Sequence, residues 1–294
     1  MRNNIKHKVY LDVNVYNELL NNGGSADLIK REGLEYYVSV AHAEELYRMM
    51  KNDSEKKNTD KINILMSIIS DSIAGVIVNG DPNGELYIES NLLPAMYRVY
   101  KQDTIDVIKQ RGVEQHDVVA ERVKQLRELD ASVLNYSNLS SKDIWNAKYV
   151  SEQLNNYEEQ RLKYNENLPI IMKILVDSGS TIEQAIRSIQ PINTPLTKGC
   201  YPEICKKSRE LLFYISGLFE ILDNCGYNKD KEVRKTVSGS YDIQHSICAT
   251  YCDILVTNDK RFLKRVSAVY YYLGVPTKVM DFAEFRKNYL DTDE

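Results

Sequence analysis

Residues 8–14 read Lys-Val-Tyr-Leu-Asp-Val-Asn, and residues 253–260 read Asp-Ile-Leu-Val-Thr-Asn-Asp-Lys. In each stretch a short apolar run ends in a carboxylate, a pattern typical of a buried strand that leads into a loop. Ligands of an open parallel α/β sheet bind at the carboxyl ends of the strands, beside the point where the strand order reverses. If the two strands are neighbours, Asp12 and Asp259 therefore predict a binding site for a hard cation.

The composition is that of a soluble globular protein. Of the 294 residues, 43% are hydrophobic and 27% are charged, as in ordinary globular domains. No apolar run approaches the length of about 20 residues that crosses a bilayer, and the polar start, residues 1–8, lacks a signal-peptide core. Five cysteines, an odd number, favour reduced thiols. We therefore expect a cytoplasmic protein without a membrane segment.

The two ends of the chain alternate between strands and helices. This alternation implies right-handed crossovers and a parallel sheet. The expected strands are 9–11, 36–40, 254–256 and 277–280. The expected helices are 15–20, 26–31, 41–50, 242–251, 261–272 and 282–289.

The middle of the chain is mostly helical in pattern. An apolar helix is expected at 62–73, and a turn at 81–84 joins two strands within 75–88. Amphipathic helices are then expected at 92–110, 113–134, 142–165, 169–177, 182–189 and 202–224. We predict a discontinuous α/β core formed by residues 1–50 and 236–294, interrupted by a mostly α-helical insertion, residues 51–235, with a β-hairpin near 75–89.

Four acidic positions lie where this topology would bring them together. Asp12 and Asp259 end strands, Asp242 is expected to open a helix, and Glu45, or its neighbour Glu44, lies in the first turns of another helix. Each acid alone has a simpler explanation as a helix cap or a solvated helix residue. Because several ionised carboxylates at one sheet edge repel each other, their coincidence favours a divalent ion, and oxygen ligands suit Mg²⁺ or Mn²⁺.

Four short segments, taken in order, form a family pattern: Tyr10-Leu11-Asp12-Val13-Asn14, Ser39-Val40-Ala41-His42-Ala43-Glu44-Glu45-Leu46, Asp242-Ile243-Gln244-His245, and Asp253-Ile254-Leu255-Val256-Thr257-Asn258-Asp259. This pattern resembles a PIN domain. That family has a compact three-layer α/β/α core with a short parallel sheet, and its members act mainly as metal-dependent endoribonucleases. The resemblance covers only the terminal parts of the chain, and the long insertion departs from the family.

The resemblance assigns the metal-binding and catalytic roles to four acids: Asp12, Glu45, Asp242 and Asp259. Glu45 is preferred to Glu44 because the family's glutamate usually precedes a buried aliphatic residue, here Leu46. Asn14 and Thr257 match polar positions that the family uses to orient a carboxylate or a phosphate.

The implied function is hydrolysis of RNA by a metal-activated water, leaving 5′-phosphate and 3′-hydroxyl ends. Lys260, Arg261, Lys264 and Arg265 form a cationic patch directly after Asp259. The side chains expected to bind the substrate, whose backbone contacts position the RNA without specifying its sequence, are Lys260, Arg261, Lys264 and His245. The resemblance leaves open a toxin or defence role, a protein inhibitor such as an antitoxin, and a homodimer.

Other functions remain open. The strand end is close to the Asp-x-Asp-x opening of haloacid-dehalogenase phosphatases, but the second acid of that motif is here Asn14. The core could also be an inert PIN-like scaffold for protein or nucleic-acid binding, which the presence of all four acids disfavours. Zinc held by His245, Cys248 and Cys252 is disfavoured as well, because the spacing lacks a second ligand pair.

Overall fold

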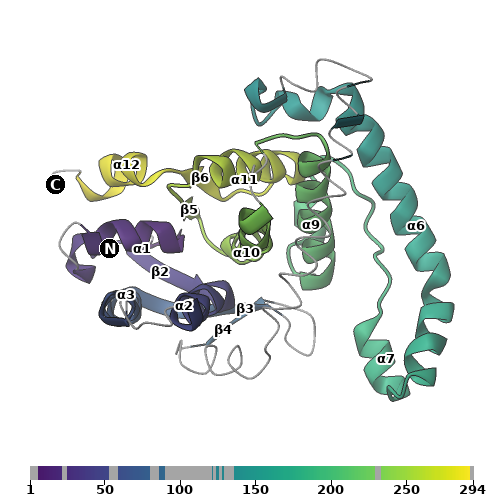
Figure 1. Ribbon diagram of the computed structural model, residues 1–294, viewed down its shortest axis with the longest axis horizontal. Helices are drawn as coiled ribbons and strands as arrows, with labels where there is room; N and C mark the ends of the chain where they lie inside the picture. Colours follow the sequence, from purple (N-terminus) through teal and green to yellow (C-terminus); the bar gives the residue numbers. More distant parts are fainter. Residues whose placement is uncertain are drawn as a thin grey trace, which may run out of the picture.

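A computed structural model of the chain describes residues 6–21, 25–52, 59–79, 86–89, 121, 124–125, 128, 136–228 and 233–291. At its centre lies a six-stranded sheet with the order β4-β3-β2-β1-β5-β6 (Figure 1). The strands are β1 (His7–Leu11), β2 (Leu34–Ser39), β3 (Ile73–Asn79), β4 (Leu86–Glu89), β5 (Ile254–Val256) and β6 (Lys278–Met280). All neighbouring strands pair in parallel except β4, which is antiparallel to β3. The fold class is therefore α/β, as predicted.

The strand order reverses at β1, which lies between β2 and β5. Val9 is in register with Tyr36 of β2 on one side and with Ile254 of β5 on the other. The backbone N–H of Asp12 donates to the carbonyl oxygen of Val256 at 3.0 Å. The two strands quoted first are thus neighbours, and their carboxyl ends meet where such sheets bind ligands.

Helices cover both faces of the sheet (Figure 1). Because side chains of a strand alternate between faces, Val9 and Leu11 belong to one buried cluster and Tyr10 to another. The first cluster includes side chains of α1 (Val13–Asn21), the short 3₁₀ helix η1 (Ala26–Leu28), α2 (Val40–Asn52), α3 (Thr59–Ser72), α12 (Phe282–Phe285) and η4 (Arg286–Leu290). The second includes side chains of α9 (Ser208–Asn224), α10 (Val233–Ala249) and α11 (Lys260–Leu273).

The predicted end of the first core segment, at residue 50, is too early. The expected hairpin is present as β3 and β4, but it belongs to the main sheet, because Val76 of β3 is in register with Val38 of β2. Leu65 and Ile69 of α3 pack in the same cluster as Val9. The α/β core therefore continues into the segment assigned to the insertion, and α9 at the other end of that segment also packs against the core.

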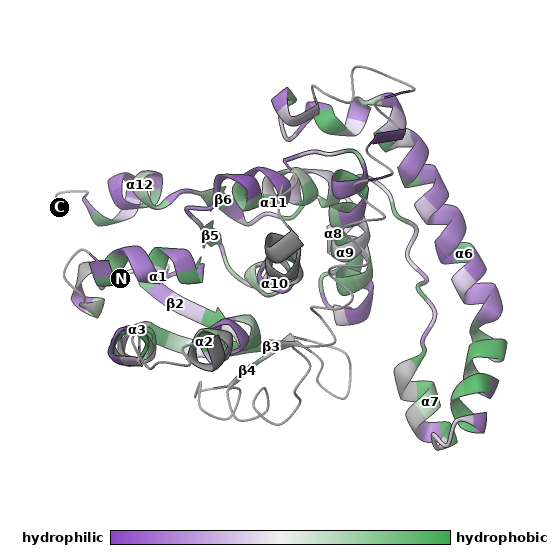
Figure 2. Cartoon of the chain, in the orientation of Figure 1, coloured by the Kyte–Doolittle hydropathy of each residue, from purple (hydrophilic) through white to green (hydrophobic). Residues whose placement is uncertain are grey.

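Among the described residues of that segment, α6 (Lys148–Asp177) and α7 (Ile182–Ser188) form a helical arm (Figure 1). The short helices η3 (Asp143–Asn146) and α8 (Tyr201–Ile204) lie at its base, where Trp145 and Ile204 are buried in the same cluster as α9. The expected helices 142–165 and 169–177 are one helix, because Pro169 removes a single backbone hydrogen bond without ending α6. The tip of the arm is apolar and exposed (Figure 2), with Ile170 and Ile182 exposed by 59% and 63%.

Two predicted helices are largely outside the described residues. The helix expected at 92–110 lies entirely outside them, and the helix at 113–134 is described only at positions 121, 124–125 and 128, which are helical. Among the helices that the structure describes, none combines the length and the apolar character of a bilayer span.

Candidate metal centre

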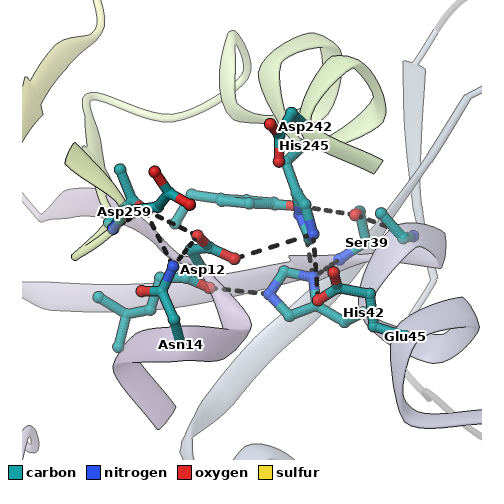
Figure 3. Close-up of polar contacts among 12 residues, drawn as sticks. Asp12, Asn14, Ser39, His42, Glu45, Asp242, His245 and Asp259 are labelled. Atoms are coloured by element: carbon teal, nitrogen blue, oxygen red, sulfur yellow. Dashed lines mark hydrogen bonds and ion pairs between the residues drawn. The ribbon is translucent and has the colours of Figure 1, made fainter. Parts of the chain in front are cut away.

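A pocket of about 240 Å³ lies at the carboxyl end of β1. It is lined by Asp12, Val13, Asn14, Asn17, Glu45, Met49, Asp242 and Asp259. All four acids predicted from the sequence therefore face one space, although they come from the end of β1, from α2, from α10 and from the residue before α11 (Figure 3). Of the two adjacent glutamates, Glu45 is among the residues that line the pocket and Glu44 is not. Burial raises the pKa of Glu44.

One oxygen of Asp12 is held by hydrogen bonds from its neighbours. The Thr257 hydroxyl donates to Asp12 Oδ2 at 2.7 Å, and the Asn14 amide donates to the same oxygen. Asn14 is fixed in turn, because its Oδ1 accepts from the backbone N–H of Asn258 at 2.9 Å. Asn14 and Thr257 thus orient a carboxylate, as the resemblance implied, and the other oxygen of Asp12 is directed toward His245.

Asp12 and Glu45 of the pocket form a close group with His245, which lies behind the lining residues. One ligand atom from each lies within 4.8 Å of the others, so the three residues could hold a metal ion. Nε2 of His245 is 3.9 Å from Asp12 Oδ1 and 3.6 Å from Glu45 Oε2. His245 is only 1% exposed, and within the described ranges its Nε2 has no hydrogen-bond partner. Because so little of the ring is exposed, His245 lies behind the carboxylates, and its expected contact with the substrate stays a prediction.

A chain of buried polar groups stands behind His245. Nδ1 of His245 is 2.6 Å from the Tyr10 hydroxyl, which is 2.6 Å from Ser39 Oγ. Beside them, Nδ1 of His42 accepts from the backbone N–H of Ser39 at 3.1 Å, so its Nε2 donates to the carbonyl of Leu11 at 2.7 Å. Burial, with a smaller contribution from His245, lowers the pKa of His42 well below its ordinary value.

Sequence reasoning missed Tyr10, Ser39 and His42. A signal for Tyr10 was present, because it precedes Asp12 by two positions, and side chains two apart in an extended chain point the same way. For Ser39 and His42, burial behind the pocket depends on where α10 packs, which no local pattern indicates.

The charges in the pocket act against one another. Burial raises the pKa of Asp12, and Glu45 raises it further, while His245 and the Thr257 hydroxyl lower it. Burial would lower the pKa of His245, but the closeness of Glu45 and the charges of Asp12 and Asp242 outweigh it, so the pKa is raised. A bound cation would relieve the repulsion between the carboxylates.

The sequence predicted that Asp242 opens a helix, and this prediction is wrong. Helix α10 begins at Val233, and Gly239 lies inside it, because a glycine within a helix costs only about 1 kcal/mol relative to alanine. The cationic partner of Asp242 is instead Arg265 of α11, whose Nη1 is 3.8 Å from Asp242 Oδ2. Nη2 of Arg265 is 2.8 Å from Asp223 Oδ1. Arg265 is buried and therefore does not belong to the exposed cationic patch.

Asp259 is both the N-cap of a helix and a residue that lines the pocket. Its Oδ1 accepts from the backbone N–H groups of Arg261 and Phe262 at 2.8 and 3.0 Å, which makes it the N-cap of α11. The simpler explanation of this acid as a cap is confirmed, and the same residue lines the pocket. On α11, Lys260 and Lys264 are exposed and Arg261 is partly buried.

Comparisons of the chain with protein-family models, curated proteins and solved structures gave no match. Inferences about function therefore depend on the geometry and chemistry of this pocket.

Proposed function

We propose that the protein is a divalent-metal-dependent endoribonuclease with a PIN-like core, which hydrolyses RNA phosphodiester bonds at this pocket. The observation that carries the proposal is the convergence of Asp12, Glu45, Asp242 and Asp259 on one pocket beside the switch point of the sheet. Ionised carboxylates that face one space repel each other unless a cation binds between them, and Asp12 is buried as well. The order of the acids along the chain and the α/β fold support the PIN-like assignment.

Asp12 and Glu45 would hold the ion, Mg²⁺ or Mn²⁺, with Asp242 and Asp259 facing the same space. When bound, such an ion polarises a phosphate oxygen and makes a water molecule easier to deprotonate. The chain itself supplies orientation. Thr257 and Asn14 occupy Oδ2 of Asp12, so its Oδ1 is directed into the cluster.

Helix α11 supplies the features expected at the substrate side. It begins beside the pocket, because its N-cap Asp259 is one of the lining residues. The exposed side chains of Lys260 and Lys264 follow directly on this helix. Cationic groups here would hold the RNA backbone without reading its sequence. They would also attract RNA to a chain whose net charge is −4.

A haloacid-dehalogenase-like phosphatase receives less support from the same pocket. Its general acid would have to occupy position 14, two residues after Asp12. Asn14 cannot release a proton, and its amide is engaged with Asp12 and, at 3.1 Å, with Thr257. A protein inhibitor, a homodimer, a toxin or defence role and a cytoplasmic location remain predictions.

The test is cleavage of end-labelled RNA by the purified full-length protein. With Mn²⁺ or Mg²⁺ we expect internal cuts in single-stranded or structured RNA, and a chelator should abolish them. Asp12→Asn should reduce the rate by several orders of magnitude without unfolding the protein. Asp253→Asn is the matched control, because Asp253 lies at the other end of β5, where its Oδ2 accepts from the N–H of Lys8 at 2.9 Å.

Three results would count against the proposal. The first is an absence of RNA cleavage with either metal ion. The second is a fully active Asp12→Asn variant. The third is hydrolysis of a small phosphate monoester without RNA cleavage, which would favour the phosphatase.

A further inference from the structure

We propose that His245 is a metal ligand through Nε2, so that the pocket selects a first-row transition ion, probed by Mn²⁺, over Mg²⁺. This inference rests on the metal site of the proposed function and deepens it, because oxygen ligands alone would suit either ion. It depends on three features of the structure: the position of Nε2, the contact made by Nδ1, and the chemistry of the resulting ligand set.

Nε2 makes no hydrogen bond to any residue that the structure describes, although two carboxylates lie within ion-pair distance of it. His245 is 1% exposed. Leaving a buried polar nitrogen unsatisfied costs about 1–3 kcal/mol. The nearest carboxylate oxygens, at 3.6 and 3.9 Å, are too far for hydrogen bonds.

Those separations are suitable for ligands of a shared ion. Atoms bound to one ion at about 2.1 Å lie roughly 3–4 Å apart, according to the angle between them. The distances of 3.6 Å to Glu45 and 3.9 Å to Asp12 fall in this range.

The contact of Nδ1 allows a lone pair on Nε2, which a metal ion could use. The Tyr10 hydroxyl has one hydrogen and two oxygen or nitrogen neighbours at 2.6 Å, Ser39 Oγ and His245 Nδ1. When Tyr10 donates to Ser39, it accepts from Nδ1–H of His245, and Nε2 is then unprotonated. Histidines that bind metals usually donate their second N–H to an oxygen in this way. Tyr10 is therefore a positioning residue.

The ligand set then contains one imidazole and two carboxylates. Mg²⁺ takes oxygen ligands and keeps several waters, whereas first-row transition ions also accept an imidazole nitrogen, Mn²⁺ the most weakly among them. The nitrogen of His245 thus gives the pocket a basis for preferring Mn²⁺ to Mg²⁺ that Asp12 and Glu45 alone would lack.

The experiment measures metal binding to the full-length, chelator-treated protein without RNA. Calorimetric titration should show that Mn²⁺ binds at least about tenfold more tightly than Mg²⁺. Losing an outer partner of a metal site costs about 10- to 100-fold in affinity. We expect Tyr10→Phe to lower Mn²⁺ affinity within that range, and His245→Gln to lower it by about 100-fold or more while Mg²⁺ binding changes little.

Two further measurements keep the test decisive. His7→Gln is the matched control, because His7 is exposed at the amino end of β1, and it should bind both ions as the unmodified protein does. If His245→Gln does not fold, pulsed electron paramagnetic resonance of Mn²⁺ in the unmodified protein decides. Modulation from a directly bound ¹⁴N nucleus supports the inference, and its absence overturns it.

The outcomes separate this inference from the proposed function. Equal affinity for the two ions, or unchanged Mn²⁺ affinity in a folded His245→Gln variant, overturns the inference even if RNA is cleaved. A preference for Mn²⁺ that depends on His245, in a protein that cleaves no RNA, supports the inference and counts against the nuclease.

Discussion

Replacing Arg265 by methionine tests how far its charge offsets the effect of burial on Asp242. The Arg265 side chain is 4% exposed and contacts Asp242 and Asp223 at 3.8 and 2.8 Å. Burial raises the pKa of Asp242 well above the ordinary carboxyl value, Arg265 opposes this rise, and the charges of Asp12 and Asp259 add to it. Without the guanidinium, we expect Asp242 to hold its proton to higher pH. The acidic limb of the pH profile of RNA cleavage should then shift to higher pH.

The magnitude follows from the same distances. Unit charges 3.8 Å apart attract by about 4 kcal/mol at an effective dielectric constant of about 20. Desolvation offsets part of this, and removing one partner of a buried pair usually costs about 3–5 kcal/mol. Asp223 and Asp242 keep 31% and 19% of their side-chain exposure. We therefore expect the lower end, a loss of about 3 kcal/mol in the free energy of unfolding.

The assay is urea denaturation at pH 7, followed by circular dichroism. Arg265→Lys keeps a positive charge and should lose less stability than Arg265→Met. Adding Asp242→Asn to Arg265→Met should recover part of the loss, because the unpaired charge is then gone. A loss below about 1 kcal/mol, the range of an exposed ion pair, would refute the reasoning. An equal loss in the lysine variant would point to packing rather than charge.

The remaining predictions concern the carboxylates and the cationic helix. Thr257→Val removes a donor to Asp12, so we expect a 10- to 100-fold fall in Mn²⁺ affinity, measured by calorimetry, and a stability loss of about 1–3 kcal/mol. Burial raises the pKa of Asp12 and Asp242, so between the unfolded and folded pKa values the folded state binds more protons than the unfolded state. The free energy of unfolding of the metal-free protein should therefore fall as pH rises above about 4. The increase in this free energy caused by saturating Mn²⁺, measured by denaturation with and without a chelator, should grow with pH. An increase that becomes smaller at higher pH would contradict this. Replacing both Lys260 and Lys264 by alanine should reduce the slope of log K for single-stranded RNA against log salt by about 1.4, or about 0.7 per lost phosphate contact, as measured by fluorescence anisotropy; an unchanged slope would exclude them from the RNA contact.

The parts of the site that could be predicted from the sequence are those with a local signal. Asp12 and Asp259 follow short apolar runs, and the alternation of strands with helices implies a parallel sheet, in which such ends converge. The sequence also predicts the N-cap formed by Asp259, because a Thr-Asn-Asp stretch suits a helix start. These inferences needed only neighbouring residues.

The parts that could not be predicted depend on tertiary contacts. Arg265 lies in a run of basic residues, and only the packing of α11 against α9 and α10 shows that its guanidinium is buried beside Asp223 and Asp242. The local pattern predicts the hairpin of β3 and β4, but the pairing of β3 with β2 depends on a tertiary contact that no local pattern indicates. The sequence predicts too late a start for α10, because Gly239 lowers helix propensity by an amount that packing can override.

The central position of β1 has a consequence for how the protein is made. Its neighbour β5 and the elements that carry His245 and Asp259 are translated more than 200 residues after β1 and Asp12. Until then one edge of β1 has no strand beside it, and an open edge of this kind invites pairing with other chains. A polypeptide truncated before α10 would carry Asp12 and Glu45 with neither His245 nor Asp259, so a prematurely terminated product would be unable to assemble the pocket.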